Sequence, residues 1–238
     1  MRTGLVIFTR GSAREPKRLG FGRQRDVALI AALREETLAL AVGVAGADHV
    51  FVASDERPND PALGWIEQQG TSFEERFVGA LAEAASRGFE RLVVVGTDTP
   101  GLTRDDLVRA FASPPGELTI GPSTDGGFYL LGIDAADLSL LRGLPYRSPR
   151  LAQALAAHSA QGRVTWLARR SDLDRADDVG SSRAEIDAIC RHRLGSVLRH
   201  ARPRRSLGVE VRTGRELRDA SAWTRGPPAN IASVSPSP

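Results

Sequence analysis

The sequence predicts a three-layer α/β domain with a mostly parallel sheet that is covered on both faces. Short apolar runs alternate with longer helical patterns along residues 3–200 of the 238-residue chain. The run Arg91–Val95 (RLVVV) is unbroken and rich in β-branched residues, which is typical of a parallel strand buried on both faces. Loops at the carboxyl ends of such strands carry the binding site, so the polar segments that follow strands are the candidates.

Each element has its own signal. An apolar run at residues 3–10 leads into a glycine-containing loop at 11–22 and a helical pattern from residue 23 to about 44. Ser72 is followed three residues later by Glu75, which is the signature of a capping box. Pro100 and Thr103 open a helix that runs to about residue 112. The remaining strands are expected at residues 49–54, 65–69, 91–95, 118–121, 126–133 and 164–168, and the remaining helices at 72–87, 149–160 and 182–200.

Composition is that of an ordinary globular protein. The chain is 41% hydrophobic and 26% charged, which excludes collagen-like, disulfide-rich and largely disordered classes. Its longest near-apolar stretch, residues 38–47, is far shorter than the roughly 18 to 20 residues of a membrane span. No export signal is expected at the N-terminus, and the single cysteine, Cys190, fits a reducing compartment. We therefore expect a cytoplasmic protein with no membrane partner.

The positive charge is concentrated near the C-terminus. Residues 201–238 hold seven arginines and three acidic residues, a net charge of +4, whereas the whole chain is +3 and residues 1–200 are therefore −1. Those first 200 residues show no basic stripe interleaved with aromatics, so we expect no nucleic-acid partner. We assign a single folded α/β domain to residues 1–200 and expect the Arg-, Pro- and Ser-rich tail, residues 201–238, to be disordered.

Two segments that follow strands could contact phosphates and a metal ion. Residues 9–19 combine small residues with several cations, as phosphate-binding loops do, although a solvated basic loop is the ordinary alternative. Lys17 is notable because it is the only lysine among 32 basic residues, and a compact ammonium is not interchangeable with arginine. Asp98 follows Arg91–Val95 and could hold Mg²⁺, or it could cap the next helix.

Two later segments allow similar alternatives. Residues 122–132 contain two adjacent glycines, which permit either a hairpin turn or the close approach of a ligand. Residues 172–179 crowd four aspartates together, and such groups repel one another unless a cation neutralises them. A metal role for one of these acids is therefore expected, with helix capping by Asp177 or Asp178 as the alternative.

Five motifs occur in order along the chain. They are Phe8, Arg10 and Lys17-Arg18-Leu19; residues 96–102 (GTDTPGL); residues 121–132 (GPSTDGGFYLLG); Tyr146 with Ser148-Pro149-Arg150; and Asp172-Leu173-Asp174. This set resembles the bacterial GT-A-type transferase family, which includes glycosyltransferases and radical-SAM/selenodomain-associated transferases. It is more distantly similar to nucleotidyltransferases such as 2-phospho-L-lactate guanylyltransferase. The resemblance spans about residues 3–180 and implies a three-layer α/β/α GT-A (nucleotide-diphospho-sugar transferase) fold.

The resemblance also implies roles for individual residues. Lys17, Asp98 and Asp125 would be the catalytic residues, and no nucleophilic side chain is needed. Asp98 would be the main ligand of Mg²⁺ (or Mn²⁺), completed by Asp174 or, as the second choice, Asp172. The residues expected around the nucleotide are Arg10, Gly11, Ser12, Arg14, Lys17, Arg18, Gln69, Gly70 and Arg76. Those expected around the acceptor are Asp125, Gly126, Gly127, Phe128 and Ser148.

Three functions remain open. A nucleotidyltransferase would use the Lys17 loop to hold an NTP, join it to a small phosphorylated or carboxylated metabolite, and release pyrophosphate. A glycosyltransferase would use a nucleotide sugar and release NDP. A nucleotide-binding module without catalysis is suggested by the first loop, which is about two residues shorter than in the family, and by the altered acidic segment that begins at Asp174. We favour the first function, and the sequence leaves room for a homodimer.

Overall fold

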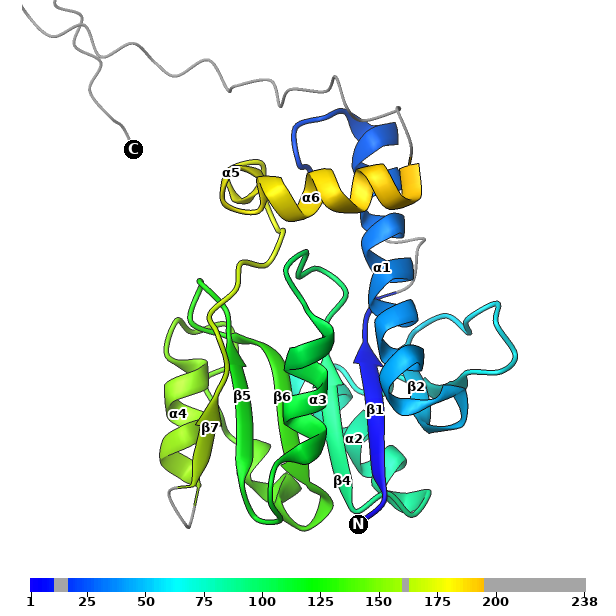
Figure 1. The fold of residues 1–238 in the computed structure, drawn as a ribbon. Helices are drawn as coiled ribbons and strands as arrows, with labels where there is room; N and C mark the ends of the chain where they lie inside the picture. Colours follow the sequence, from blue (N-terminus) through cyan, green and yellow to red (C-terminus); the bar gives the residue numbers. More distant parts are fainter. Residues whose placement is uncertain (11–16, 160–162, 195–238) are drawn as a thin grey trace, which may run out of the picture. The chain divides into compact units, whose positions relative to one another are not determined.

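The computed structural model describes residues 1–10, 17–159 and 163–194 (Figure 1). The expected tail from residue 201 onward lies outside the described residues. Three residues of the expected nucleotide loop, Gly11, Ser12 and Arg14, lie outside them as well.

The centre of the fold is a seven-stranded sheet in the order β3-β2-β1-β4-β6-β5-β7. Strand β6 runs antiparallel to its neighbours β4 and β5, and every other pairing is parallel. The mostly parallel sheet is therefore confirmed, with a β5–β6 hairpin inside it. The strands are β1 Thr3–Phe8, β2 Val50–Ser54, β3 Gly64–Glu67, β4 Arg91–Val95, β5 Leu118–Pro122, β6 Phe128–Asp134 and β7 Val164–Trp166.

Helices cover both faces of the sheet, as a three-layer domain requires (Figure 1). One core contains side chains of α2 and α4, and the other contains side chains of α1 and α3. The helices are α1 Arg23–Ala45, α2 Phe73–Ser86, α3 Arg104–Ala112, α4 Leu151–His158, α5 Asp178–Ser181 and α6 Arg183–Ile189. Shorter helical turns are η1 Ala47–His49, η2 Ala135–Leu141 and η3 Cys190–Leu194.

Strand β4 explains the unbroken apolar run in the sequence. Leu92 and Val94 face the core formed with α2 and α4, whereas Val93 and Val95 face the core formed with α1 and α3. All five residues of the strand are buried. A strand with a core on each face has no solvent side that would select polar residues, so the alternation disappears.

Helix α1 serves two cores along its length. Its C-terminal half packs on the sheet through residues such as Ala41. Its N-terminal half instead packs through Leu29 and Leu33 against α5, α6 and Leu173. This third cluster brings the last described helices next to the loop that follows β1. No local pattern in the sequence predicted this contact.

The helix ends test several local predictions. The capping box of Ser72 and Glu75 is confirmed at the start of α2. Thr103 caps α3 in the same way with Asp106, so the alternative role of Asp98 as the cap of that helix is excluded. The last helix, expected over residues 182–200, is confirmed in its described part, because α6 is followed directly by the helical turn η3. Residues 195–200 lie outside the described residues.

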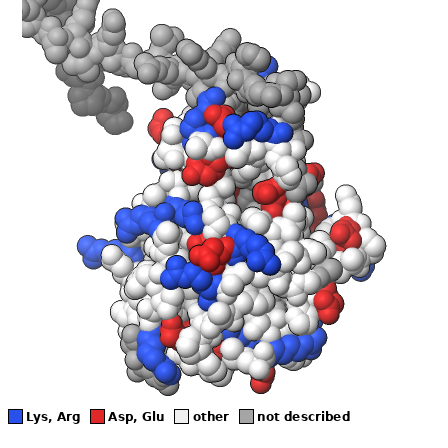
Figure 2. Space-filling view, in the orientation of Figure 1, with Lys and Arg blue, Asp and Glu red and all other residues white. Residues whose placement is uncertain are grey.

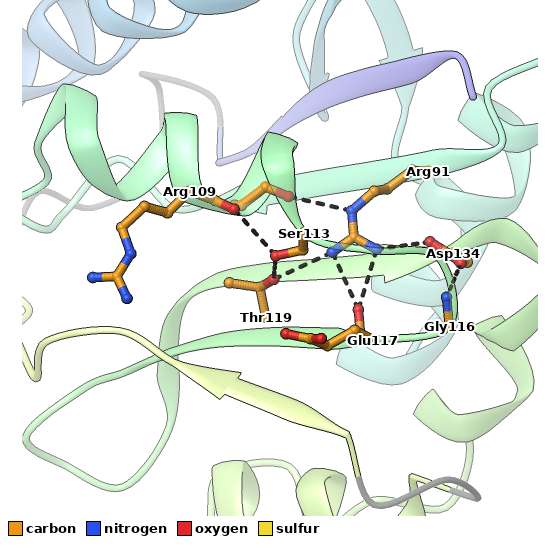
Figure 3. Close-up of polar contacts among 8 residues, drawn as sticks. Arg91, Arg109, Ser113, Gly116, Glu117, Thr119 and Asp134 are labelled. Carbon is orange, nitrogen blue, oxygen red and sulfur yellow. Dashed lines mark hydrogen bonds and ion pairs between the residues drawn. The ribbon is translucent and has the colours of Figure 1, made fainter.

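A buried arginine at the start of β4 joins this strand to the β5–β6 hairpin, at the end of the sheet opposite the carboxyl ends of the parallel strands (Figure 3). The Arg91 side chain is 0% exposed, and its guanidinium pairs with Asp134 at 2.7 Å. It also donates to the backbone oxygens of Ala110 and Glu117 and to the hydroxyl of Thr119. Because each nitrogen of the Arg91 guanidinium has a hydrogen-bond acceptor, its positive charge can remain buried at the start of the central strand.

We expect Arg91→Met to lower the free energy of unfolding by about 3–5 kcal/mol, because it leaves the Asp134 carboxylate without its cation in a nearly dry site. Urea unfolding would measure the loss. Arg183→Ala is the matched control, since it removes an exposed i,i+4 pair with Asp187 that contributes about 0.5 kcal/mol or less. Equal losses for the two variants would contradict a structural role for the buried pair.

Candidate functional site

The candidate site lies where the order of strands reverses. From β1 the chain moves outward to β2 and β3, then returns to place β4 on the other side of β1. Because β1 and β4 are adjacent and parallel, the loops that follow them begin side by side at the carboxyl ends of the strands, and both lead to helices, α1 and α3, on the same face of the sheet. In open α/β sheets ligands bind at this switch point. Lys17 comes from the first of these loops and Asp98 from the second.

Lys17 holds two carboxylates together at this point. Its ammonium nitrogen Nζ lies 2.7 Å from Oδ2 of Asp98 and 2.6 Å from Oδ1 of Asp174. Burial by itself would lower the pKa of Lys17, but the two carboxylates outweigh it, and the pKa is raised. The ammonium thus stays charged and marks a place where the protein stabilises a cation.

A buried carboxylate in the first turn of α1 positions the end of the Lys17 loop. Asp26 accepts hydrogen bonds from the backbone N–H groups of Leu19, at 3.2 Å, and of Phe21, at 3.1 Å. Leu19 is itself fully buried against the N-terminal half of α1. The chain two residues beyond Lys17 is therefore fixed, while the lysine side chain remains long enough to move its charge.

Main-chain bonds bring the late acidic segment to the end of β4. The backbone N–H of Leu173 donates to the carbonyl of Asp98 at 2.7 Å, which places the aspartates on either side of Leu173 next to Asp98. Asp178 accepts from the backbone N–H groups of Asp174 and Arg175 and so braces their turn. Asp177, at the start of α5, makes no side-chain capping bond. Asp178 thus stabilises a turn instead of capping a helix by its side chain.

Asp172 is the third carboxylate of this cluster. It accepts a hydrogen bond from the Thr99 hydroxyl at 2.6 Å. Burial and the neighbouring charges of Asp98, Asp125 and Asp174 raise its pKa to about 7, against the lowering effect of the Thr99 bond. The cluster therefore carries more negative charge than one lysine neutralises, which favours a further cation.

The donor set fits a hard divalent cation. Asp98 and Asp174 already converge on one positive charge, and carboxylate oxygens are preferred ligands of Mg²⁺. Among the described residues no group of three or more His, Cys, Asp or Glu side chains forms a ready cage for a metal. This agrees with the habit of Mg²⁺, which binds through one or two carboxylates together with substrate phosphates. Lys17 would have to leave at least one carboxylate for the ion to enter.

Hydroxyl and amide groups for which the sequence predicted no individual role join the ends of β1, β2 and β4 near Lys17. The Thr9 and Thr97 hydroxyls are hydrogen-bonded at 3.0 Å and join the ends of β1 and β4. Gln68 donates through Nε2 to the carbonyls of Thr9 and Ala53, both at 2.8 Å. Strand alternation could have found Gln68, because it lies two residues after buried Ile66 on the same face.

The other expected nucleotide residues are spread around this edge. Arg10 is exposed directly after β1. Arg76 donates to the carbonyls of Gly70 and Thr71 and so supports the loop before α2. Gln69 lines a separate groove of about 300 Å³ between β3 and α2. The structure thus brings Lys17 together with Asp98 and Asp174 but places Gln69 beside the separate groove between β3 and α2.

The turn expected to face the acceptor is held firmly in place. Asp125 accepts from the Ser123 hydroxyl and from the N–H of Gly127. Gly126 has φ +90°, and a Cβ there would meet the carbonyl oxygen of Pro149 at 1.9 Å, so only glycine fits. Phe128, in contrast, packs against the core that contains Phe77.

Ser148 ends the loop that leads into α4, where its hydroxyl oxygen accepts a hydrogen bond from the N–H of Arg150. This bond organises the start of the helix.

Charges of both signs are interspersed on the face shown in Figure 2, with acidic groups near the middle flanked by basic ones. Among the described residues on that face, the basic groups are interrupted by acidic ones and form no continuous stripe of the kind that follows a nucleic-acid backbone. None of the helices in the described part of the chain has the length and apolar composition needed to cross a bilayer.

Comparison with known proteins supports the same fold. A family model described as "Uncharacterized protein conserved in bacteria (DUF2064)" matches residues 28–148. A crystal structure described as a proposed nucleotide-diphospho-sugar transferase from Desulfovibrio desulfuricans is similar at TM-score 0.63 and 18% identity, over 79% of this chain and 99% of that one. The 4-diphosphocytidyl-2C-methyl-D-erythritol synthase of Anaerococcus prevotii is similar at TM-score 0.53 and 11% identity, over 78% and 96%. No curated protein matches the sequence.

These likenesses confirm the expected fold of the nucleotide-diphospho-sugar transferase type.

We expect Asp172→Asn to stabilise the protein, by a larger amount at about pH 8 than at about pH 5. The folded-state pKa of about 7 lies above the ordinary 3.8, so the folded protein binds this proton more tightly than the unfolded chain. Stability is therefore lost as the pH rises through the folded-state value, and an amide avoids that loss while it can still accept the Thr99 bond. Urea unfolding without divalent cations would measure it, and a gain that does not grow with pH would contradict the assignment.

Proposed function

This chain belongs to the family described as "Uncharacterized protein conserved in bacteria (DUF2064)", and from that premise we propose that it is a nucleotide-dependent transferase. The observation that carries the proposal is the ammonium of Lys17 held between Asp98 and Asp174 at the switch point of the sheet. A partly exposed lysine ammonium beside two carboxylates can be shared between protein and substrate. It can neutralise the phosphates of an incoming nucleotide while the carboxylates accept a metal ion.

Nucleotidyl transfer is the reaction we propose. An oxygen of a small phosphorylated or carboxylated acceptor attacks the α-phosphorus of an NTP and forms a new P–O bond. The bond from that phosphorus to the bridging oxygen breaks, and its electron pair leaves with pyrophosphate. Because the acceptor oxygen is already anionic, no side chain has to remove a proton from it. Such transfers depend on positioning and charge neutralisation more than on a covalent catalyst.

The chain's own residues would divide these tasks. Lys17 would contact the triphosphate, and the raised pKa keeps it charged for that contact. Asp98 and Asp174 would hold Mg²⁺ (or Mn²⁺), which when bound neutralises phosphate charge and orients the phosphates. Asp172, bonded to Thr99, would adjust the charge of the cluster. The bond between Leu173 and Asp98 would keep the two acidic segments in register during turnover.

Glycosyl transfer from a nucleotide sugar is the second candidate. It is favoured by the likeness in fold to the proposed nucleotide-diphospho-sugar transferase of Desulfovibrio desulfuricans. The same carboxylates and metal would then hold the diphosphate leaving group. The product distinguishes the two reactions, because nucleotidyl transfer releases pyrophosphate and glycosyl transfer releases NDP.

We expect one NTP to raise the melting temperature in the presence of Mg²⁺ more than its NDP or its NDP-sugars do, because a ligand that binds only the folded state stabilises it. Asp98→Ala should abolish the part of the shift that depends on Mg²⁺. A thermal-shift screen of the four NTPs, their NDPs and several NDP-sugars, each with and without Mg²⁺, would measure this. A phosphate assay coupled to pyrophosphatase would then detect turnover.

Asp48→Ala is the matched control for this screen. It also removes a carboxylate, but its side chain is 84% exposed in η1, which precedes β2 at the opposite edge of the sheet. An Asp98 variant that binds nucleotide and Mg²⁺ as well as the control would overturn the site. If an NDP-sugar gives the largest shift, the result supports glycosyl transfer instead. If nucleotide binds but no donor is turned over, the protein is a nucleotide-binding module without catalysis.

A further inference from the structure

A cavity of about 430 Å³ opens beside the turn that carries Asp125, outside the cluster around Lys17. It lies between the β5–β6 turn, the start of α4 and the end of β7, which are on the left of Figure 1. A volume of this size suits a small metabolite. The residues used below are Asp125, Gln153, Trp166 and Arg169, all of which line it.

Two adjacent arginines near this cavity behave differently. Arg170 is committed to the structure: it pairs with buried Asp106 at 2.7 Å and lies over the ring of Tyr129. Arg169 lines the cavity and is exposed, and among the described residues it has no ion-pair partner. The cavity therefore contains a guanidinium whose charge is available to a carboxylate or a phosphate.

The other walls supply an apolar surface and hydrogen-bonding groups. Trp166 is 45% exposed, although large apolar side chains of the described chain are mostly buried. Its indole offers a flat surface for the carbon skeleton of a small molecule. Asp125 uses Oδ1 for its turn, and within the described part of the chain Oδ2 accepts no hydrogen bond. Oδ2 of Asp125 and the Gln153 amide can form hydrogen bonds with hydroxyl groups of a ligand.

Backbone ties connect this cavity with the Lys17 cluster. Thr124 donates through its N–H to the carbonyl of Arg170 at 2.9 Å, and Arg170 donates to the carbonyl of Pro122 at 3.1 Å. The cavity wall is thereby joined to the segment that carries Asp172. Asp125 is also close enough to Asp172 to act on it electrostatically. A molecule in the cavity would therefore lie next to the proposed transfer site.

We propose that this cavity binds the acceptor as a small hydroxylated compound that carries a carboxylate or a phosphate. Arg169 would bind the anionic group, Trp166 would support the carbon skeleton, and Asp125 with Gln153 would bind hydroxyls. The role as acceptor site rests on the proposed function, whereas the binding itself does not require nucleotide. Binding and nucleotide use can therefore be tested separately.

The test is calorimetric titration of the full chain with 3-phosphoglycerate and with glycerol 3-phosphate, in the absence of nucleotide. We expect at least one of them to bind in the millimolar range or tighter, and glycerol and inorganic phosphate to bind at least about tenfold more weakly. Arg169→Ala should weaken binding about tenfold or more, because a charge-assisted contact is lost. Tryptophan fluorescence should change on binding, and Trp166→Phe should remove that change.

Arg109→Ala is the matched control, because Arg109 is exposed on α3 and its side chain points away from the polar network at the far edge of the sheet (Figure 3). The proposal is overturned if neither phosphorylated probe binds, if inorganic phosphate binds as tightly as they do, or if the Arg169 and Arg109 variants bind equally. The same preparations are screened with NTPs and Mg²⁺. Probe binding without nucleotide binding would refute the proposed function alone, and the reverse result would refute only the acceptor site.

Discussion

The burial of β4 constrains the rest of the structure. Both faces of this strand lie in apolar cores, so the charged residues at its two ends must be neutralised by other parts of the chain. At its start Arg91 is paired with Asp134 of β6, which fixes the hairpin against the central strand. Beyond its end Asp98 receives the ammonium of Lys17 from the loop after β1. The first arrangement is buried, whereas the second is about one-third exposed and so accessible to a ligand.

This difference separates a structural charge pair from a functional one. Arg91 has an acceptor in every direction and is 0% exposed, so no ligand can replace its partners without unfolding the edge of the sheet. Lys17 is held by side chains alone and is 30% exposed, so a phosphate can compete for it. The backbone around it is fixed by Asp26 and by the bond from Leu173 to Asp98. A stable frame with a replaceable ion pair is suited to binding charged substrates.

The sequence located the strands well and the ligand-facing side chains less completely. The run at Arg91–Val95 and the Ser72 capping box are local signals, and the structure confirms both. Arg169 was missed because a polar side chain at a strand end has the same local pattern whether it faces solvent, a cavity or a neighbouring carbonyl, whereas the alternation with buried Ile66 could have identified Gln68. The sequence also did not predict that β6 runs antiparallel to its neighbours, because two adjacent glycines permit both a hairpin and a ligand-binding turn.

The sequence by itself determined the α/β alternation, the placement of polar loops after strands and the choice of Lys17 and Asp98 as candidates, because these follow from periodicity and residue chemistry within short segments. Only the tertiary structure decided that Asp174, and not Asp172, shares the ammonium of Lys17 with Asp98, and that the N-terminal half of α1 packs on α6. These are contacts between segments far apart in sequence. Their geometry depends on strand order and on how the buried β4 is covered, which no local pattern encodes.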